Sequence, residues 1–143
     1  MSTEAEQFEQ AYTDLQCLII AQVNKFSTEK LTATQFLILD VIIKQGDRTT
    51  SQLADYFRIT APAISRQIRK LMSDGLVIQK RDDTDRRSYF NSITPKGRKL
   101  VNEAGKLRKT MTTEISRILT AEDRKTFIRL CHHITSRISI GKS

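Results

Sequence analysis

The hydrophobic positions of the chain repeat mostly at helical spacing. In residues 5–27 they recur in steps of three and four, which predicts a helix with one apolar stripe. The members of this stripe are Phe8, Tyr12, Leu15, Ile19, Val23 and Phe26. Residues 33–45 are apolar almost all round, so we expect a second helix that is buried on several sides.

Helix start signals divide the next part of the chain. Thr32 stands three residues before Gln35, and Thr49 stands three before Gln52, which is the spacing of a capping box. Helices are therefore predicted over 33–45 and 50–57. A third, over 61–74, follows Thr60 after a connection of three residues. Two short helices joined in this way are typical of a helix-turn-helix.

The period then changes from helical to alternating. Residues 76–81 and 88–93 are short and β-prone, and they flank the polar segment 82–87, which predicts a β-hairpin. Thr94 followed by Pro95 predicts the start of a long helix over 95–119. Thr120 precedes a last helix, which is expected over 121–138. The predicted fold is mainly α with a small β-hairpin wing. Its winged helix-turn-helix part spans about 33–94.

Charge and composition narrow the function. The chain has 143 residues, with 24 Lys and Arg against 16 Asp and Glu, and a net charge of +8. Such a basic surplus favours nucleic acid as a partner, with an anionic membrane second, although a merely soluble basic protein stays open on charge alone. No apolar run reaches the length of a membrane span, and the acidic start lacks the features of a signal peptide. We therefore expect a cytoplasmic protein without a membrane partner.

Little in the chain suggests an enzyme. It has two His, no Trp and five Gly, and no phosphate-binding loop, dinucleotide fingerprint or zinc-protease motif is present. Cys131, His132 and His133 are adjacent, and neighbouring residues of a helix point about 100° apart, so they do not suit one metal ion. We predict no catalytic residue, no metal and no cofactor.

The predicted helix 61–74 has one core face and one polar face. Ile64, Ile68, Leu71 and Met72 are expected in the core. The N-terminal part of such a second helix reads base edges in the major groove. The candidate DNA-binding residues of this helix are Ala61, Pro62, Ala63, Ser65, Arg66, Gln67, Arg69 and Lys70. Arg69 and Lys70 are assigned to phosphates, and the alternative for the whole face is an ordinary solvated surface.

The wing tip mixes arginines with three acids, which a purely electrostatic arm would not need. We hypothesise that Asp85 orients a guanidinium through a hydrogen-bonded pair while Arg86 or Arg87 enters the minor groove. The candidate wing residues are Arg81, Asp85, Arg86 and Arg87. The alternative is a charged, disordered loop.

Several short motifs together resemble the MarR (multiple-antibiotic-resistance regulator) family of winged helix-turn-helix transcription factors. They are Leu31-Thr32, Leu53-Ala54, Ile64-Ser65-Arg66, Gly75-Leu76-Val77, Arg81-Asp82, Asp85-Arg86-Arg87 and Ile93-Thr94-Pro95-Lys96-Gly97. The resemblance covers nearly the whole chain and implies one domain over 1–143, with dimerisation helices in 1–30 and 95–143. It implies a homodimeric repressor that binds a palindromic operator in double-stranded DNA and is released by a small-molecule or oxidant signal.

Two further expectations concern the signal. Cys17 resembles in its context the reactive cysteine of the peroxide-sensing branch of the family, which makes it a candidate redox sensor; the alternative is a small apolar residue at an interface. A small-molecule effector is expected in the crevice between the dimer helices and the winged part. The competing function is that of a non-specific or architectural nucleic-acid-binding protein, which would bind DNA without a large specificity ratio.

Overall fold

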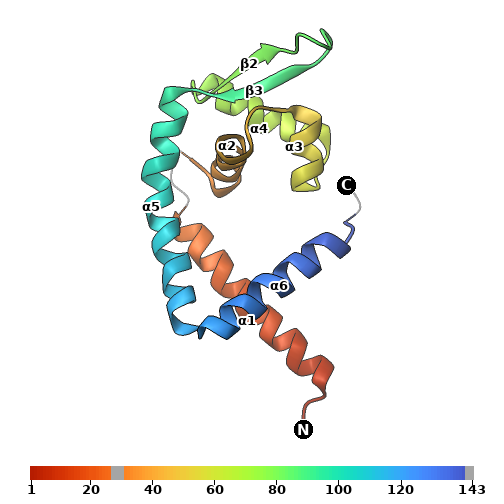
Figure 1. Cartoon of the computed structure of the whole chain (residues 1–143), viewed down its shortest axis with the longest axis vertical. Coiled ribbons are helices and arrows are strands. Elements are labelled where there is room, and N and C mark those ends of the chain that lie inside the picture. The colour runs from red at the N-terminus through yellow and green to blue at the C-terminus, as the bar shows by residue number, and fades with distance from the viewer. Residues whose placement is uncertain (27–30, 141–143) are drawn as a thin grey trace.

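The computed structural model describes residues 1–26 and 31–140, and it is mainly helical with one small sheet. Its elements, in chain order, are α1 (Glu4–Phe26), α2 (Ala33–Gln45), β1 (Arg48–Thr49), α3 (Thr50–Phe57), α4 (Ala61–Ser73), β2 (Val77–Arg81), β3 (Tyr89–Ile93), α5 (Pro95–Ile118) and α6 (Ala121–Arg137). Figure 1 shows α2, α3, α4 and the sheet gathered at one end, with α5 descending beside them toward α1 and α6. The predicted winged helix fold is confirmed.

Helix α2 lies at the centre of the winged part. Its capping box forms as predicted, because the Thr32 hydroxyl accepts the amide of Gln35 at 3.2 Å and the Gln35 side chain accepts the amide of Thr32 at 3.1 Å. The helix has buried side chains on several sides, as its apolar sequence predicted: Gln35, Phe36, Ile38, Leu39, Val41 and Ile42. It ends at Gly46, whose φ of 86° is accessible to glycine without a Cβ penalty.

The helix-turn-helix is confirmed in helices α3 and α4. Ile64, Ile68 and Leu71 of α4 are at most 2% exposed, and they anchor the helix in the core. The expectation that Met72 also lies in the core is wrong, since its side chain is 39% exposed. Met72 is about 80° around the helix from Ile64, so it falls at the edge of the buried stripe.

The sheet has three strands in the order β1-β3-β2, one more than the predicted hairpin. Strands β2 and β3 pair antiparallel, with Val77 opposite Ile93 and Arg81 opposite Tyr89. The added strand β1 consists of Arg48 and Thr49, which pair with Asn91 and Phe90. Two residues are too short to show an alternating pattern, so only the tertiary pairing reveals this strand.

The junction from β3 to α5 brings the long helix close to β2. The Thr94 hydroxyl accepts the amide of Gly97 at 3.0 Å and donates to the carbonyl of Gly75 at 2.7 Å. A Cβ added at Gly97 would lie only 2.4 Å from the carbonyl oxygen of Leu76. Glycine at this position therefore lets the first turn of α5 pack directly on the start of β2.

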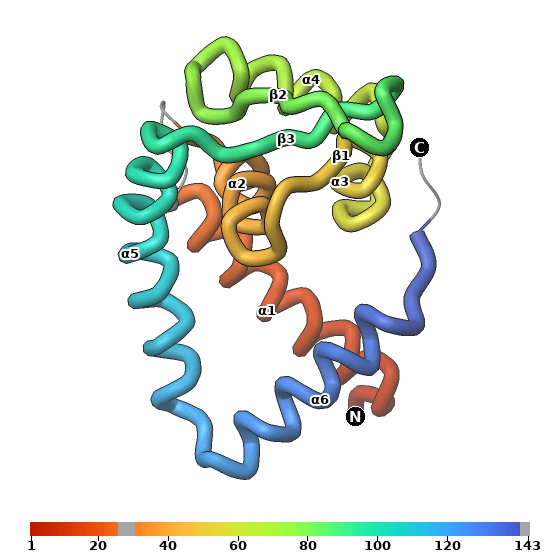
Figure 2. The backbone as a smooth tube through the Cα atoms, turned by 45° about the horizontal axis from the view of Figure 1, so that its top comes forward, coloured from red at the N-terminus to blue at the C-terminus, as the bar shows by residue number. Residues whose placement is uncertain are grey.

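Helix α1 extends away from the winged part, whereas α6 starts at the far end of α5 and runs back toward α3, as Figure 2 shows. Helix α6 has no buried residue, and the α1 stripe predicted from the sequence is exposed at Phe8, Tyr12, Leu15, Ile19 and Val23. The predicted end of the first helix at residue 27 lies outside the described residues. Among those residues, no helix is long and apolar enough to cross a membrane.

Candidate nucleic-acid interface

Helix α4 presents a polar face over a firmly anchored core face. Thr60 caps the helix by accepting the amide of Ala63 at 3.3 Å, and Pro62 occupies its first turn, where no intrahelical partner is lost. Because the core-facing side chains of α4 are buried, the helix is held in place and its exposed side chains have fixed starting points. This is the rigidity that a helix needs to present side chains to a DNA groove.

The eight residues predicted on this helix share its accessible surface. Ala61, Pro62, Arg66, Arg69 and Lys70 are exposed, and Ala63, Ser65 and Gln67 are half-buried. The ammonium group of Lys70 bonds to the Asp74 carboxylate at 3.3 Å, in an exposed i,i+4 pair. Such a surface pair is weak, so Lys70 is available to a phosphate.

The base of the wing is held by a contact that the sequence did not reveal. The guanidinium of Arg81 donates to the Tyr89 hydroxyl at 3.0 Å and lies 5.6 Å from the centre of the Tyr89 ring. This hydrogen bond raises the pKa of Arg81 further above its usual range. Tyr89 therefore orients the guanidinium of Arg81, an exposed residue at the end of the β2–β3 pairing.

The wing tip is ordered by its acids in a way that differs from the hypothesis. Asp85 accepts the backbone amide of Arg87 at 3.0 Å and the Ser88 hydroxyl at 3.2 Å, and within the described residues it forms no ion pair with an arginine. The expected Asp–Arg side-chain pair is therefore wrong. Because aspartate bonds readily to amides two residues ahead, Asp85 shapes the backbone of the turn instead.

A second aspartate supports the same loop. Asp82 accepts both the amide and the hydroxyl of Thr84, at 2.9 and 2.8 Å, and these bonds lower the pKa of its carboxyl group. Arg86 and Arg87 are exposed at the tip, and their guanidinium groups make no hydrogen bond or ion pair with the described residues. The two acids thus organise the loop and leave two cationic groups free to contact a partner.

A buried polar group, also missed from the sequence, connects the sheet to α3. Asn91 is fully buried; its amide donates to the carbonyl of Arg48 at 3.0 Å and to the Thr50 hydroxyl at 3.3 Å. A polar residue between Phe90 and Ser92 in a strand was the available signal, but the two groups that accept from its amide lie more than 40 positions away. The network fixes the wing relative to the start of α3.

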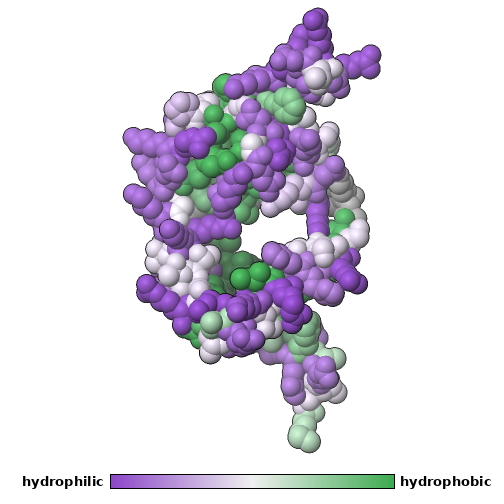
Figure 3. Space-filling view, viewed as in Figure 1, coloured by the Kyte–Doolittle hydropathy of each residue, from purple (hydrophilic) through white to green (hydrophobic). Residues whose placement is uncertain are grey.

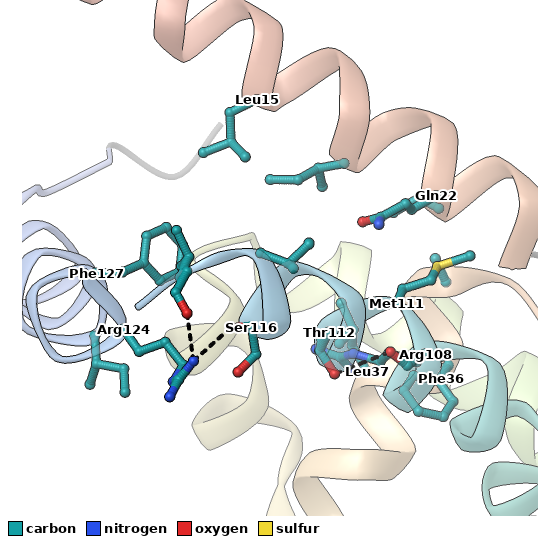
Figure 4. Close-up of a pocket in the computed structure, with 16 residues that line it drawn as sticks. Leu15, Gln22, Phe36, Leu37, Arg108, Met111, Thr112, Ser116, Arg124 and Phe127 are labelled. Carbon is teal, nitrogen blue, oxygen red and sulfur yellow. Dashed lines mark hydrogen bonds between the residues drawn. The ribbon is translucent and has the colours of Figure 1, made fainter. Parts of the chain in front are cut away.

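A cavity separates the winged part from the outer helices. It has a volume of about 510 Å³ and is lined mainly by apolar side chains of α1, α2, α5 and α6. Figure 4 shows Phe36, Arg108 and Thr112 on one side and Phe127 on the other. The guanidinium of Arg108 lies 5.4 Å from the Phe36 ring centre, while Arg124 is engaged with the carbonyls of Ser116 and Leu119.

The cysteines and histidines lie on the outer helices α1 and α6. Cys17 is exposed on α1, and its neighbours Leu18, Ile19 and Ile20 are exposed apolar residues. Cys131 is half-buried on α6, and His132 and His133 beside it are exposed. In residues 1–26 and 31–140, no group of three or more His, Cys, Asp or Glu is placed to hold a metal ion.

Comparison with known proteins gives one consistent family. The sequence model of the MarR family matches residues 30–88. The HTH-type transcriptional regulator MhqR of Bacillus subtilis is 27% identical over 111 residues, which cover 78% of this chain and 74% of MhqR.

Solved structures agree in fold. The transcriptional regulator BldR of Sulfolobus solfataricus is 25% identical and has a TM-score of 0.77, with 96% of this chain and 100% of BldR covered. Streptococcus pneumoniae FabT, solved in complex with DNA, has a TM-score of 0.75 at 20% identity, with 93% and 96% covered. The winged part and the outer helices of this chain thus share one known arrangement.

Proposed function

This chain belongs to the MarR family of DNA-binding transcriptional regulators, and from this premise we propose that it is a homodimeric repressor of a palindromic operator. The observation that carries the proposal is the exposed face of α4, with Arg66, Arg69 and Lys70 over an anchored core face. Figure 2 shows this helix and the β2–β3 wing together at one end of the molecule. We place its action in the cytoplasm, where operator DNA would be accessible.

The assignment of roles follows from geometry. The first turns of α4, with the small residues Ala61 and Ala63, let the helix backbone approach the major groove, and Arg66 can grip a guanine with two hydrogen bonds. Arg69 and Lys70 are one turn further along and would contact phosphates. In the wing, Arg86 or Arg87 would enter the minor groove from a loop that Asp82 and Asp85 hold in shape.

The homodimer is supported by apolar surface that this chain leaves uncovered. Large hydrophobic side chains of α1 and α6 that do not line the cavity are 44–71% exposed: Phe8, Tyr12, Leu18, Ile20, Leu130 and Ile134. Monomeric proteins rarely leave so large an apolar surface in contact with water. A second copy would cover the same face of the first, as two-fold symmetry requires. The repressor role is what the resemblance to the MarR family implies.

The proposal is tested by selecting bound DNA from a random duplex pool at about 0.15 M salt, where weak surface electrostatics are screened. The expected product is an inverted repeat whose half-sites are about one helical turn apart, because each protomer reads one major groove. We expect a preference of about 10³ or more over random DNA. Binding without convergence would instead identify a non-specific or architectural protein.

Sedimentation at micromolar concentration tests the dimer separately. The expected mass is twice the 16.4 kDa of the chain. A monomer would overturn the homodimer, and with it the reading of two half-sites.

The 510 Å³ cavity supports a small-molecule effector as the signal. Its volume and its mainly apolar lining are typical of sites for drug-sized ligands. Since α1 and α6 form one wall and α2 another, a molecule bound there would shift the winged part relative to the dimer helices. A Thr112→Trp change, which fills the cavity from α5, is expected to keep operator affinity while abolishing release by any compound that dissociates the native complex.

An oxidant acting at Cys17 is the alternative signal. The thiol is accessible in the single chain, but the apolar residues around it belong to the face that the partner would cover. We therefore assign Cys17 to the interface and the signal to the cavity. If peroxide releases the native protein from its operator but not the Cys17→Ser variant, the oxidant alternative is the correct one.

A further inference from the structure

Arg58, in the turn between α3 and α4, has an unusual backbone conformation. Its φ of 57° and ψ of 39° are left-handed, and it is the one non-glycine residue with positive φ among those that the structure describes. This region favours glycine because a Cβ is crowded there. An arginine that accepts such strain is a reason to look for a function of its side chain.

The side chain reaches across the molecule to the end of α6. Its Nη1 donates to the carbonyl of Ile138 at 2.7 Å, and its Nη2 donates to the carbonyl of Thr135. Because α6 ends at Arg137, the carbonyl of Thr135 has no amide within the helix to bond to. A guanidinium also complements the partial negative charge of a helix C-terminus. The two bonds join residues that are 77 and 80 positions apart.

This contact connects the winged part to the outer helices at a further place. On one side, the winged part is joined to the outer helices by α5, which Figure 1 shows running past α2. Figure 3 shows an opening between the winged part and the helices below it. Arg58 spans from α3 to α6 on the side away from α5, and α4 begins at Ala61, only three residues later.

We propose that Arg58 is a positioning residue: it holds the α3–α4 turn against the C-terminus of α6 and so sets the separation of the two α4 helices in the dimer. This inference rests on the proposed function as a homodimer. Without Arg58, the winged part is joined to the outer helices through α5 and through the contact of α1 with α2, and it can tilt about them. With Arg58 in place it is held on both sides, and only one half-site spacing fits well.

The first test compares duplexes that carry the selected inverted repeat with its spacer changed by one or two base pairs. Each added base pair moves a half-site by about 3.4 Å and rotates it by about 35°. The native protein is expected to lose about tenfold or more in affinity for each change, whereas Arg58→Gln and Arg58→Gly are expected to lose less than about threefold. Affinity for a single half-site is expected to stay within about twofold for all of them.

The variants separate the side chain from the backbone. Arg58→Gln removes the two hydrogen bonds and keeps a side chain at the left-handed φ. Arg58→Gly removes the bonds and also the steric cost of that φ, so it is not expected to impair folding. Arg58→Lys can reach one carbonyl and is expected to restore part of the spacing preference. Arg129→Gln, an exposed change on α6, matches the lost charge and is expected to behave as the native protein.

The second test measures the two reading heads directly, without DNA. A spin label at Ser51→Cys, in a background of Cys17→Ser and Cys131→Ser, reports one distance between the protomers of a dimer. We expect a narrow distribution of distances when Arg58 is kept, with or without Arg129→Gln. For Arg58→Gln and Arg58→Gly we expect a clearly broader distribution. Equal widths, or an unchanged spacing preference, would overturn the role of Arg58 while leaving the proposed function intact. Absence of any signal between protomers would overturn the homodimer itself, and this inference with it.

Discussion

Gln79 and Asn91 lie opposite each other in β2 and β3, and the Gln79 amide donates a hydrogen bond of 3.1 Å to the Asn91 side-chain carbonyl. The other end of the Asn91 amide bonds to the carbonyl of Arg48, so one side chain links all three strands. Since Asn91 is fully buried, these bonds are made away from water, where an unpaired partner is costly.

Replacing Asn91 with Ala is therefore expected to lower the free energy of unfolding by about 1–3 kcal/mol, because the half-buried Arg48 carbonyl and Thr50 hydroxyl lose their bonds. Urea denaturation measures this. Asn102→Ala, at an exposed position of α5, is the matched control and is expected to change the value by less than about 0.5 kcal/mol. Equal effects of the two substitutions would contradict the role given to Asn91.

Two glycines of α5 allow a second prediction with an internal control. A Cβ at Gly97 would meet the Leu76 carbonyl at 2.4 Å and the Ile93 side chain at 2.9 Å, so Gly97→Ala is expected to destabilise the protein by about 1–3 kcal/mol. At Gly105 the nearest atoms are those of Phe36, at 3.9 Å, which is ordinary contact. There, Gly→Ala is expected to stabilise the helix by roughly 0.5–1 kcal/mol. Thermal unfolding measures both variants, and we expect a lower Tm for Gly97→Ala and a higher Tm for Gly105→Ala. Shifts of Tm in the same direction would contradict the role given to Gly97.

Substitutions in α4 should separate base contacts from phosphate contacts. Arg66→Ala is expected to weaken binding to the selected operator by about 1–3 kcal/mol, with little change in binding to random duplex DNA. Arg69→Ala is expected to weaken both equally and to reduce the slope of log affinity against log salt by about one unit. Titration of each variant at several salt concentrations measures both quantities. The same loss on both duplexes for Arg66→Ala would remove it from the base-reading residues.

The wing offers a test of how Asp85 acts. If it shapes the turn by accepting the Arg87 amide, Asn can replace it, because an amide oxygen accepts the same bond. We therefore expect Asp85→Asn to keep operator affinity and Asp85→Ala to weaken it roughly two- to tenfold, since Arg86 and Arg87 must then be ordered on binding. A guanidinium pair, as the sequence suggested, would instead make Asn as harmful as Ala.

Interactions within a few residues could be predicted directly from the sequence. Five of the threonines at the helix starts, Thr32, Thr49, Thr60, Thr94 and Thr120, precede helices that the sequence predicts, and all five cap them. Each bond joins residues three positions apart, so the spacing alone contains the information. The same is true of the anchored face of α4, where Ile64, Ile68 and Leu71 repeat at helical steps. The candidate reading residues followed from the opposite face.

The tertiary structure decided what depends on residues far apart in the chain. Strand β1 forms because Arg48 pairs with Asn91, 43 positions later. The hydrogen bonds of Arg58 form because the end of α6 returns to the α3–α4 turn. Asp85 differs from these two cases, because its bond to the Arg87 amide spans only two residues and reflects a local preference of aspartate. Local sequence determines which helices form and which faces are buried, since these depend on neighbouring residues. The placement of the exposed α4 face and of the wing relative to the outer helices depends on contacts that exist only once the chain has folded.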